Sequence, residues 1–202
     1  MTNLIYPCLW FDGQAKAAAV FYCSVFKNSK ITANNAMVTT FEIDGKKFMG
    51  LNGGSLFKMN PSISFFVLCN SEVEIEEKWN MLSKDGSVMM PLNKYPWSEK
   101  YGWCQDKFGV NWQLMKNDMV SSTEKIIPSL MFTESNAGNA EKAINFYISI
   151  FKNSSVVQLS RYEKGEHDVE GTIKHAQFTL SHQLFAAIVR GRMPLHSMRE
   201  FH

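Results

Sequence analysis

The sequence lacks a hydrophobic run long enough to cross a membrane, and it lacks a concentration of charge of one sign. Its longest strongly apolar stretch, residues 64–69, is far shorter than the roughly 20 residues that a membrane-spanning helix needs. The amino terminus has neither a basic start nor a long apolar segment. Lys and Arg number 21 against 19 Asp and Glu, and like charges nowhere gather in a run. We therefore expect a cytoplasmic protein that contacts neither a membrane nor a nucleic acid.

Cysteine is also scarce, and its spacing argues against two common uses. Cys8, Cys23, Cys69 and Cys104 lie far apart with no C-x-x-C pair, which suits neither a disulfide scaffold nor a structural zinc site. Apolar residues make up 45% of the chain, so we expect most of these thiols to be small core residues. A nucleophilic Cys104 needs a nearby base, and all five histidines lie at residue 167 or beyond. An inert, buried thiol is the expectation there.

The chain contains an internal repeat. Residues 21–29 recur as residues 146–154, an offset of 146 − 21 = 125, with seven of nine positions identical. The likeness extends upstream, from 7–11 to 128–132 once a few extra residues near 134–138 are allowed, and downstream, from 41–48 to 178–185.

The pattern of the first copy predicts a βαβββ module. A strand near residues 4–11 precedes a helix at about 14–26, in which Ala15, Ala18, Ala19, Tyr22 and Phe26 form one stripe. Three strands are expected at 31–37, 38–43 and 46–51, with Asp44-Gly45 as a hairpin turn between the last two.

A second module follows, and then a repeat of the first module alone. The second is predicted as a strand at 62–68, a helix at 72–82 capped by Asn70 or Ser71, and strands at 87–93, 101–106 and 111–115. We predict a complete domain over 1–118, a linker over 119–126 and a partial domain over 127–202. The fold class is α+β, with tandem βαβββ modules curling into cup-like mixed sheets.

The motifs on these modules carry a resemblance to a known family. Phe21-Tyr22 on the first helix and the sequence DKFGVNWQ at 106–113 resemble a vicinal-oxygen-chelate domain, the glyoxalase, bleomycin-resistance and dioxygenase fold. The segments LWF at 9–11, DG at 44–45, NGG at 52–54 and YGWC at 101–104 are similar to its PhnB-like members, often described as 3-demethylubiquinone-9 3-methyltransferase-like. The resemblance extends through Ile188.

Methyl transfer does not follow from that description. Enzymes that use S-adenosylmethionine normally receive it at a glycine-rich turn after a parallel strand. Gly53-Gly54 follows a predicted hairpin and has no G-x-G spacing, so we do not expect this activity.

The resemblance also implies where a metal would bind in the family's metal-dependent enzymes, which use His and Glu on the first and last strands of two modules. The corresponding positions here are Pro7 or Cys8, Asn52, Ser62 or Ser64, and Gln113. None is His, Asp or Glu, and neutral oxygens alone are weak ligands. His175 and His182, seven residues apart, are expected at the surface, on opposite faces of a strand or on either side of a turn near Ser181. We predict no metal and no cofactor.

What remains is a cup lined by amides and aromatic rings, which suits a small organic ligand. The predicted ligand-binding residues are Trp10, Asn52, Ser64, Trp103, Cys104 and Gln113. Trp10 and Trp103 could equally be core residues. Three functions stay open: a small-molecule-binding protein, with or without catalysis by amides and hydroxyls; a drug-sequestering resistance protein; and a metal-dependent lyase, isomerase or dioxygenase with unusual ligands. No catalytic residue is assigned.

The carboxyl-terminal residues 189–202 do not match residues 52–66 of the first copy. DNA that encodes 193–202 can, one base out of phase, encode a sequence similar to 57–64. We therefore hypothesise a frameshift or truncation that removed a last module. A single module left without its partner module would expose an apolar concave face and an unpaired sheet edge, and both favour association. We therefore expect a homodimer with contacts mainly from residues 127–190.

Overall fold

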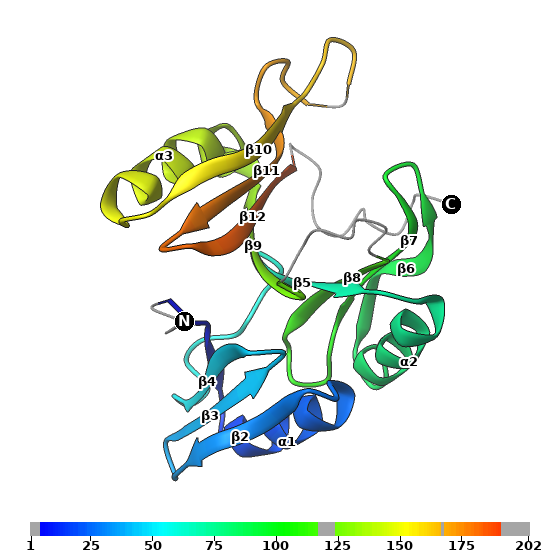
Figure 1. The fold of residues 1–202 in the computed structure, drawn as a ribbon, viewed down its shortest axis with the longest axis vertical. Coiled ribbons are helices and arrows are strands. Elements are labelled where there is room, and N and C mark those ends of the chain that lie inside the picture. The colour runs from blue at the N-terminus through cyan, green and yellow to red at the C-terminus, as the bar shows by residue number, and fades with distance from the viewer. Residues whose placement is uncertain (1–4, 117–123, 167, 191–202) are drawn as a thin grey trace. The chain divides into compact units, whose positions relative to one another are not determined.

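The computed structural model describes residues 5–116, 124–166 and 168–190 (Figure 1). The chain divides into two compact units. Unit 1 comprises residues 1–61 and 65–126, and unit 2 comprises residues 62–64 and 127–202. Residues 119–123 of the predicted linker and all of the predicted carboxyl-terminal frameshift, 193–202, lie outside the described residues.

Unit 1 contains two βαβββ modules. The first consists of β1 (Cys8–Phe11), α1 (Ala15–Val25), β2 (Ser29–Asn34), β3 (Val38–Ile43) and β4 (Lys46–Asn52), with sheet order β1-β4-β3-β2. The second consists of β5 (Ile63–Cys69), α2 (Glu72–Leu82), β6 (Ser87–Tyr95), β7 (Ser98–Gln105) and β8 (Asn111–Lys116), with the equivalent order β5-β8-β7-β6. Only the first two residues of β5 belong to unit 2. In each, the first and last strands pair in parallel.

Unit 2 repeats this topology once. Its elements are β9 (Ile126–Thr133), the 3₁₀ helix η1 (Glu134–Asn139), α3 (Ala140–Ile150), β10 (Ser155–Arg161), β11 (Ile173–Leu180) and β12 (Gln183–Arg190), with order β9-β12-β11-β10. The extra residues near 134–138 form η1. In every module the helix packs against its own sheet (Figure 1). The predicted α+β fold of repeated βαβββ modules is confirmed.

The hairpin between β3 and β4 forms at the predicted Asp44-Gly45. Both residues have positive φ, 48° and 78°, which is the conformation that a tight hairpin turn requires and that Gly adopts without strain. Strands β3 and β4 then alternate between buried and partly exposed residues, so their apolar side chains, Phe41 and Phe48 among them, face the core of unit 1.

The core of unit 1 is shared by its two modules. Tyr22 on α1 and Phe26, the cap residue that follows this helix, are fully buried. Their rings lie 5.3 and 5.5 Å from the ring of Trp112 on β8. Phe48 on β4 contacts Phe65 on β5, with ring centroids 5.3 Å apart. Aromatic pairs of this kind add to the free energy gained from burial, so the first helix stabilises the second module as well as its own.

Asp106 is the polar centre of this core and is 3% exposed. Its Oδ2 accepts hydrogen bonds from the Tyr22 hydroxyl at 2.9 Å and the Trp112 indole at 2.8 Å. Its Oδ1 accepts from the backbone N–H groups of Phe108 and Val110, at 2.8 and 3.0 Å. Desolvation raises the pKa of Asp106, while these four hydrogen bonds act in the opposite direction. The Phe-Tyr and D-x-F-G-V-x-W motifs therefore meet in one structural hydrogen-bond network.

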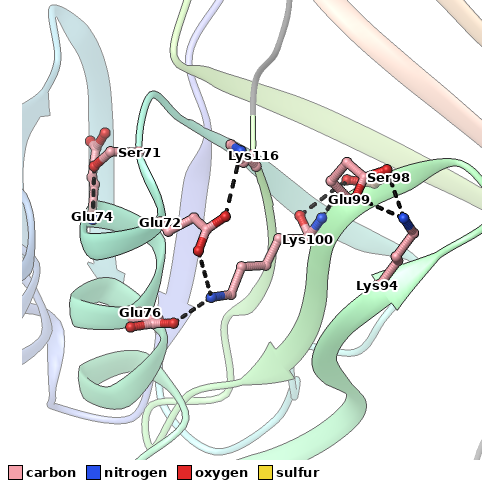
Figure 2. Close-up of polar contacts among 9 residues, drawn as sticks. All are labelled: Ser71, Glu72, Glu74, Glu76, Lys94, Ser98, Glu99, Lys100 and Lys116. Atoms are coloured by element: carbon pink, nitrogen blue, oxygen red, sulfur yellow. Dashed lines mark hydrogen bonds and ion pairs between the residues drawn. The ribbon is translucent and has the colours of Figure 1, made fainter.

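Helix α2 begins at a cap and is tied to its sheet by ion pairs. The Ser71 hydroxyl accepts from the N–H of Glu74 at 3.1 Å, as the sequence predicted for this start. Figure 2 shows Lys100 of β7 beside Glu72 and Glu76, and Lys116 of β8 pointing toward Glu72. The Lys116 Nζ lies 3.6 Å from a Glu72 oxygen. Such exposed pairs contribute little stability, so α2 is held mainly by its buried Ile75 and Leu82. Among the described residues, no helix has the length and apolarity to cross a membrane.

Candidate functional site

The helix-free face of β7 and β8 carries two aromatic side chains that are hydrogen-bonded to two amides. The Tyr101 hydroxyl donates to Gln113 Oε1 at 2.6 Å, and the Trp103 indole N–H donates to Asn111 Oδ1 at 3.3 Å. Trp103 and Gln113 are direct partners in the strand register. We call Tyr101, Trp103, Asn111 and Gln113 the amide–aromatic face; all four are buried. Trp103 and Gln113 therefore point to the same side of the sheet, as strand alternation predicts. That they line a ligand-binding cup stays a prediction.

An aromatic platform extends this face toward solvent. The rings of Tyr95 and Trp97 stack with centroids 5.1 Å apart and an interplanar angle of 22°. Tyr101 meets them edge-on, at 5.7 and 6.0 Å. Trp97 is 60% exposed. We call Tyr95, Trp97 and Tyr101 the platform.

Sequence reasoning missed Tyr95, Trp97, Tyr101 and Asn111. A signal was available, because Tyr101 and Trp103 are two residues apart on one strand and Asn111 and Gln113 are two residues apart on the next. That spacing puts each pair on one face of its strand.

Trp10 and Asn52 lie in the first module, where both are used by the fold. The Trp10 indole donates to the Gly54 carbonyl at 2.7 Å and covers Gly53, where a Cβ would come within 2.2 Å of the ring. Asn52 Oδ1 accepts from the N–H of Ala15 at 2.9 Å, at the start of α1, and its Nδ2 donates to the Ala36 carbonyl at 2.9 Å. The NGG motif therefore anchors the first helix and the Trp10 ring.

Cys104 is not on the amide–aromatic face, which corrects its assignment to a common lining with Trp103 and Gln113. It follows Trp103 directly, so its side chain points to the opposite side of β7. There it is fully buried in the core of unit 1. Desolvation, with a smaller contribution from Asp106, raises its pKa to about 12, so the thiol is protonated at neutral pH, as expected for an inert thiol. Ser64 is also buried, but it belongs to unit 2.

The expectation for the other cysteines holds in part. Cys69 is buried in the core of unit 1, whereas Cys23 is half-buried and Cys8 is exposed. Cys8 begins β1, so its side chain lies opposite to the buried Leu9. Strand alternation explains why the Cys8 side chain lies outside the core.

Unit 1 also has an open cavity of about 610 Å³ between α1 and α2. Val25, Lys27, Ser71 and Lys78 are among the residues that line it, and none of the six predicted ligand-binding residues does. Basic and acidic side chains are mixed there, and Lys78 is paired with Glu74. This cavity therefore offers no concentrated charge for an ionic ligand.

Two histidines, His175 and His182, lie in the part of the chain that the structure describes. Within the described ranges, no group of three or more His, Cys, Asp or Glu side chains could hold a metal ion. His182 is exposed in the turn between β11 and β12, where its φ is 66°. His175 on β11 is half-buried rather than at the surface, which corrects that expectation, and desolvation lowers its pKa.

This burial predicts a pH dependence for unit 2. In the unfolded chain His175 has its ordinary pKa of 6.5, and burial in the folded chain lowers that pKa, so the unfolded state binds more protons between the two values. The free energy of unfolding should therefore fall as the pH drops below about 6.5 and level off below the folded pKa. We expect His175→Gln to flatten this slope in urea unfolding at a series of pH values, and His182→Gln to leave it unchanged. Equal slopes for all three proteins would contradict the prediction.

Comparison with known proteins gives the family of this chain. The model of the 3-demethylubiquinone-9 3-methyltransferase family matches residues 3–115 and residues 124–200. Among solved structures, a putative 3-demethylubiquinone-9 3-methyltransferase, PhnB protein, from Bacillus cereus is 34% identical. The match covers 57% of this chain and 100% of that one, with a TM-score of 0.54. No match was found among curated proteins.

Two further solved structures share the fold at low identity. A protein from Pseudomonas aeruginosa is 21% identical over 57% of this chain and 98% of its own, with a TM-score of 0.50. A glyoxalase I mutant from Zea mays is 12% identical over 89% of this chain and 65% of its own, with a TM-score of 0.59. These likenesses agree with the predicted glyoxalase fold. The chain therefore belongs to the 3-demethylubiquinone-9 3-methyltransferase family, to which its likeness to a PhnB protein also points.

Proposed function

We propose that this protein binds a small planar organic molecule in a cup of the βαβββ modules, against the amide–aromatic face and the platform. The observation that best supports this is the double pairing of a ring with a side-chain amide, Tyr101 with Gln113 and Trp103 with Asn111. Ligand sites typically combine apolar, aromatic walls with a few fixed polar groups. The Tyr101 ring connects the buried pairs to the platform. The exposed Trp97 ring offers a surface on which a planar ligand can stack.

Methyl transfer is the activity for which the Bacillus cereus protein is named, and the geometry here does not favour it. The Trp10 ring packs against Gly53, and its N–H is bonded to the Gly54 carbonyl. The glycine pair after β4 therefore contacts the Trp10 indole, which occupies the space that a nucleoside cofactor would need. We favour ligand binding over methyl transfer for this reason.

The alternative of a metal-dependent lyase, isomerase or dioxygenase fits the donor set poorly. Asn52 offers a neutral amide whose oxygen and nitrogen both bond the backbone, and the Gln113 oxygen accepts from Tyr101. Exposed Cys8 has a pKa raised by desolvation, which disfavours the thiolate that binds metals. No reaction step is assigned to a metal here.

Binding can be tested with named probes: 4-nitrophenol as a planar phenol, methylglyoxal with glutathione as an electrophile, and bleomycin as a drug. We expect at least one to bind in calorimetry and to quench tryptophan fluorescence. Trp97→Ala should weaken that binding by about fivefold, since one stacking contact is worth about 1 kcal/mol. Phe146→Ala is the matched control, because Phe146 is an aromatic residue with 61% exposure in unit 2.

The outcomes separate the alternatives. No binding at millimolar probe, or equal losses in both variants, would contradict the proposed site. Chromatography of the recovered probe then distinguishes sequestration, in which the probe returns unchanged, from an enzyme that converts it.

A further inference from the structure

The open cavity between α1 and α2 is a second candidate site, separate from the proposed one. Its volume of about 610 Å³ lies within the range of small-molecule sites, about 300–1,000 Å³. The described residues that line it all belong to unit 1, and none of them is part of the amide–aromatic face or the platform. A ligand in this cavity would therefore be bound by a different set of side chains.

One wall of the cavity is a stripe of side chains along α2. Ser71, Glu74, Lys78 and Met81 all line the cavity, and their spacing of three or four residues puts them on one side of the helix. The end of α1 and the residues that follow it, up to Asn28, line another part. The wall thus combines two helices of the two modules of unit 1.

The α2 wall holds an ion pair whose charges are already compensated. The Lys78 ammonium is paired with Glu74, and its Nζ lies 5.7 Å from the centroid of the Phe26 ring, at the end of α1. Glu74 also accepts from the N–H of Asn70 at 2.8 Å. Desolvation raises the pKa of Glu74, but these hydrogen bonds and the charge of Lys125 outweigh it and leave that pKa lowered. Glu74 is therefore ionised at neutral pH, and the pair carries no net charge.

Four other charged side chains line the cavity, two of each sign. The basic ones are Lys27 and Lys125, and the acidic ones are Asp44 and Glu77. Within the part of the chain that the structure describes, none of these four belongs to an ion pair. The lining also contains three apolar side chains, Val25, Val73 and Met81. A ligand with one charge would be repelled by two of the four groups, whereas a zwitterion can pair with both signs.

We propose that this cavity binds a small zwitterion of the amino-acid class, such as a dipeptide. Its carboxylate pairs with Lys27 and Lys125, and its ammonium pairs with Asp44 and Glu77. Hydrogen bonds between ionised groups are stronger than those between neutral groups. The apolar part of the ligand packs against Val73.

The first test varies the ligand and leaves the protein unchanged. The dipeptide Leu-Gly is titrated into the full chain in a calorimeter, where we expect a Kd of about 1 mM or tighter. N-acetyl-Leu-Gly lacks the ammonium group, and Leu-Gly amide lacks the carboxylate. Each should bind about fivefold more weakly, which is the effect of losing one partly exposed ion pair.

The second test assigns each end of the dipeptide to a side chain. Glu77→Gln should weaken Leu-Gly binding about fivefold and leave the binding of N-acetyl-Leu-Gly unchanged, because the acetylated peptide has no ammonium to pair. Lys125→Gln should weaken Leu-Gly binding equally and leave the binding of Leu-Gly amide unchanged. Lys16→Gln is the matched control, because Lys16 is exposed on α1 and lies outside the cavity lining.

Three results would overturn the proposal. The first is the absence of Leu-Gly binding at about 10 mM peptide, ten times the Kd expected for a weak ligand. The second is equal binding of Leu-Gly and its two blocked forms. The third is equal binding of Leu-Gly by the Glu77→Gln, Lys125→Gln and Lys16→Gln proteins. If a variant does not fold, the blocked peptides with the unchanged protein decide the question.

Discussion

Replacing Asp106 with alanine is expected to lower the free energy of unfolding of unit 1 by about 4 kcal/mol. The carboxylate accepts four hydrogen bonds in the core, and its removal leaves buried donors without an acceptor, each at a cost of about 1–3 kcal/mol. Structural relaxation and water entry reduce the sum. The measurement is urea unfolding followed by tryptophan fluorescence, since Trp112 reports this core.

Two variants serve as controls for Asp106→Ala. Asp12→Ala removes an exposed carboxylate and should change the stability by less than about 0.5 kcal/mol. Tyr22→Phe removes one of the four hydrogen bonds and should cost about 1–2 kcal/mol. If Asp106→Ala were no worse than Asp12→Ala, the carboxylate would not be the centre of the core.

The substitution Gly86→Ala is expected to destabilise unit 1 by about 3 kcal/mol. A Cβ at Gly86 would lie 2.1 Å from the backbone oxygen of Gln105 and 3.1 Å from the backbone of Asp106. Backbone atoms cannot rotate away as a side chain can, so β6 and β7 must separate, and overpacking of this kind costs about 1–3 kcal/mol or more. The displacement also disturbs the Asp106 network.

Gly138→Ala is the matched control, because a Cβ there meets no atom within 4 Å and its φ is not positive. We expect its effect on thermal unfolding to be within about 0.5 kcal/mol. A Gly86→Ala protein as stable as the Gly138→Ala protein would show that the close approach of Gly86 to Gln105 is not rigid.

Much of the fold could be predicted because its signals are local. The 72–82 helix and the 38–43 strand are found with their predicted bounds, since a cap, a period and a turn dipeptide each act within a few residues. Strand β7 begins at Ser98 rather than at the predicted 101, because Tyr95 still pairs with Ser98 across the hairpin. That pairing depends on contacts with β6, and the sequence around residue 98 alone does not reveal them.

The same limit applies to the two Asp-Gly pairs. Asp44-Gly45 and Asp85-Gly86 look alike as turn signals. Gly45 is needed for its positive φ and has open space around its α-carbon. Gly86 has no positive φ, and it is needed because a neighbouring strand passes close by. The sequence shows the dipeptides, and the tertiary contact decides what each glycine does.

The candidate site, like the fold, could be predicted only in part from the sequence. Strand alternation was enough to put Trp103 and Gln113 on one side, and applied consistently it also excludes Cys104. It could not show that Asn52 bonds the start of α1 or that Trp97 stacks on Tyr95. These contacts join residues that are distant in sequence or lie in an irregular turn.

The two copies of the repeat separate what the sequence determines from what the tertiary structure decides. The sequence by itself determined that residues 21–25 and 146–150 are helical with the same apolar pattern, because helical hydrogen bonds join residues only a few positions apart. Only the tertiary structure decided that Tyr22 is buried against Trp112 while Ile150 is 56% exposed. A side chain is buried only where a second surface packs on it. For Tyr22 that surface is Trp112, about 90 residues away in the sequence, whereas the described residues leave more than half of Ile150 exposed.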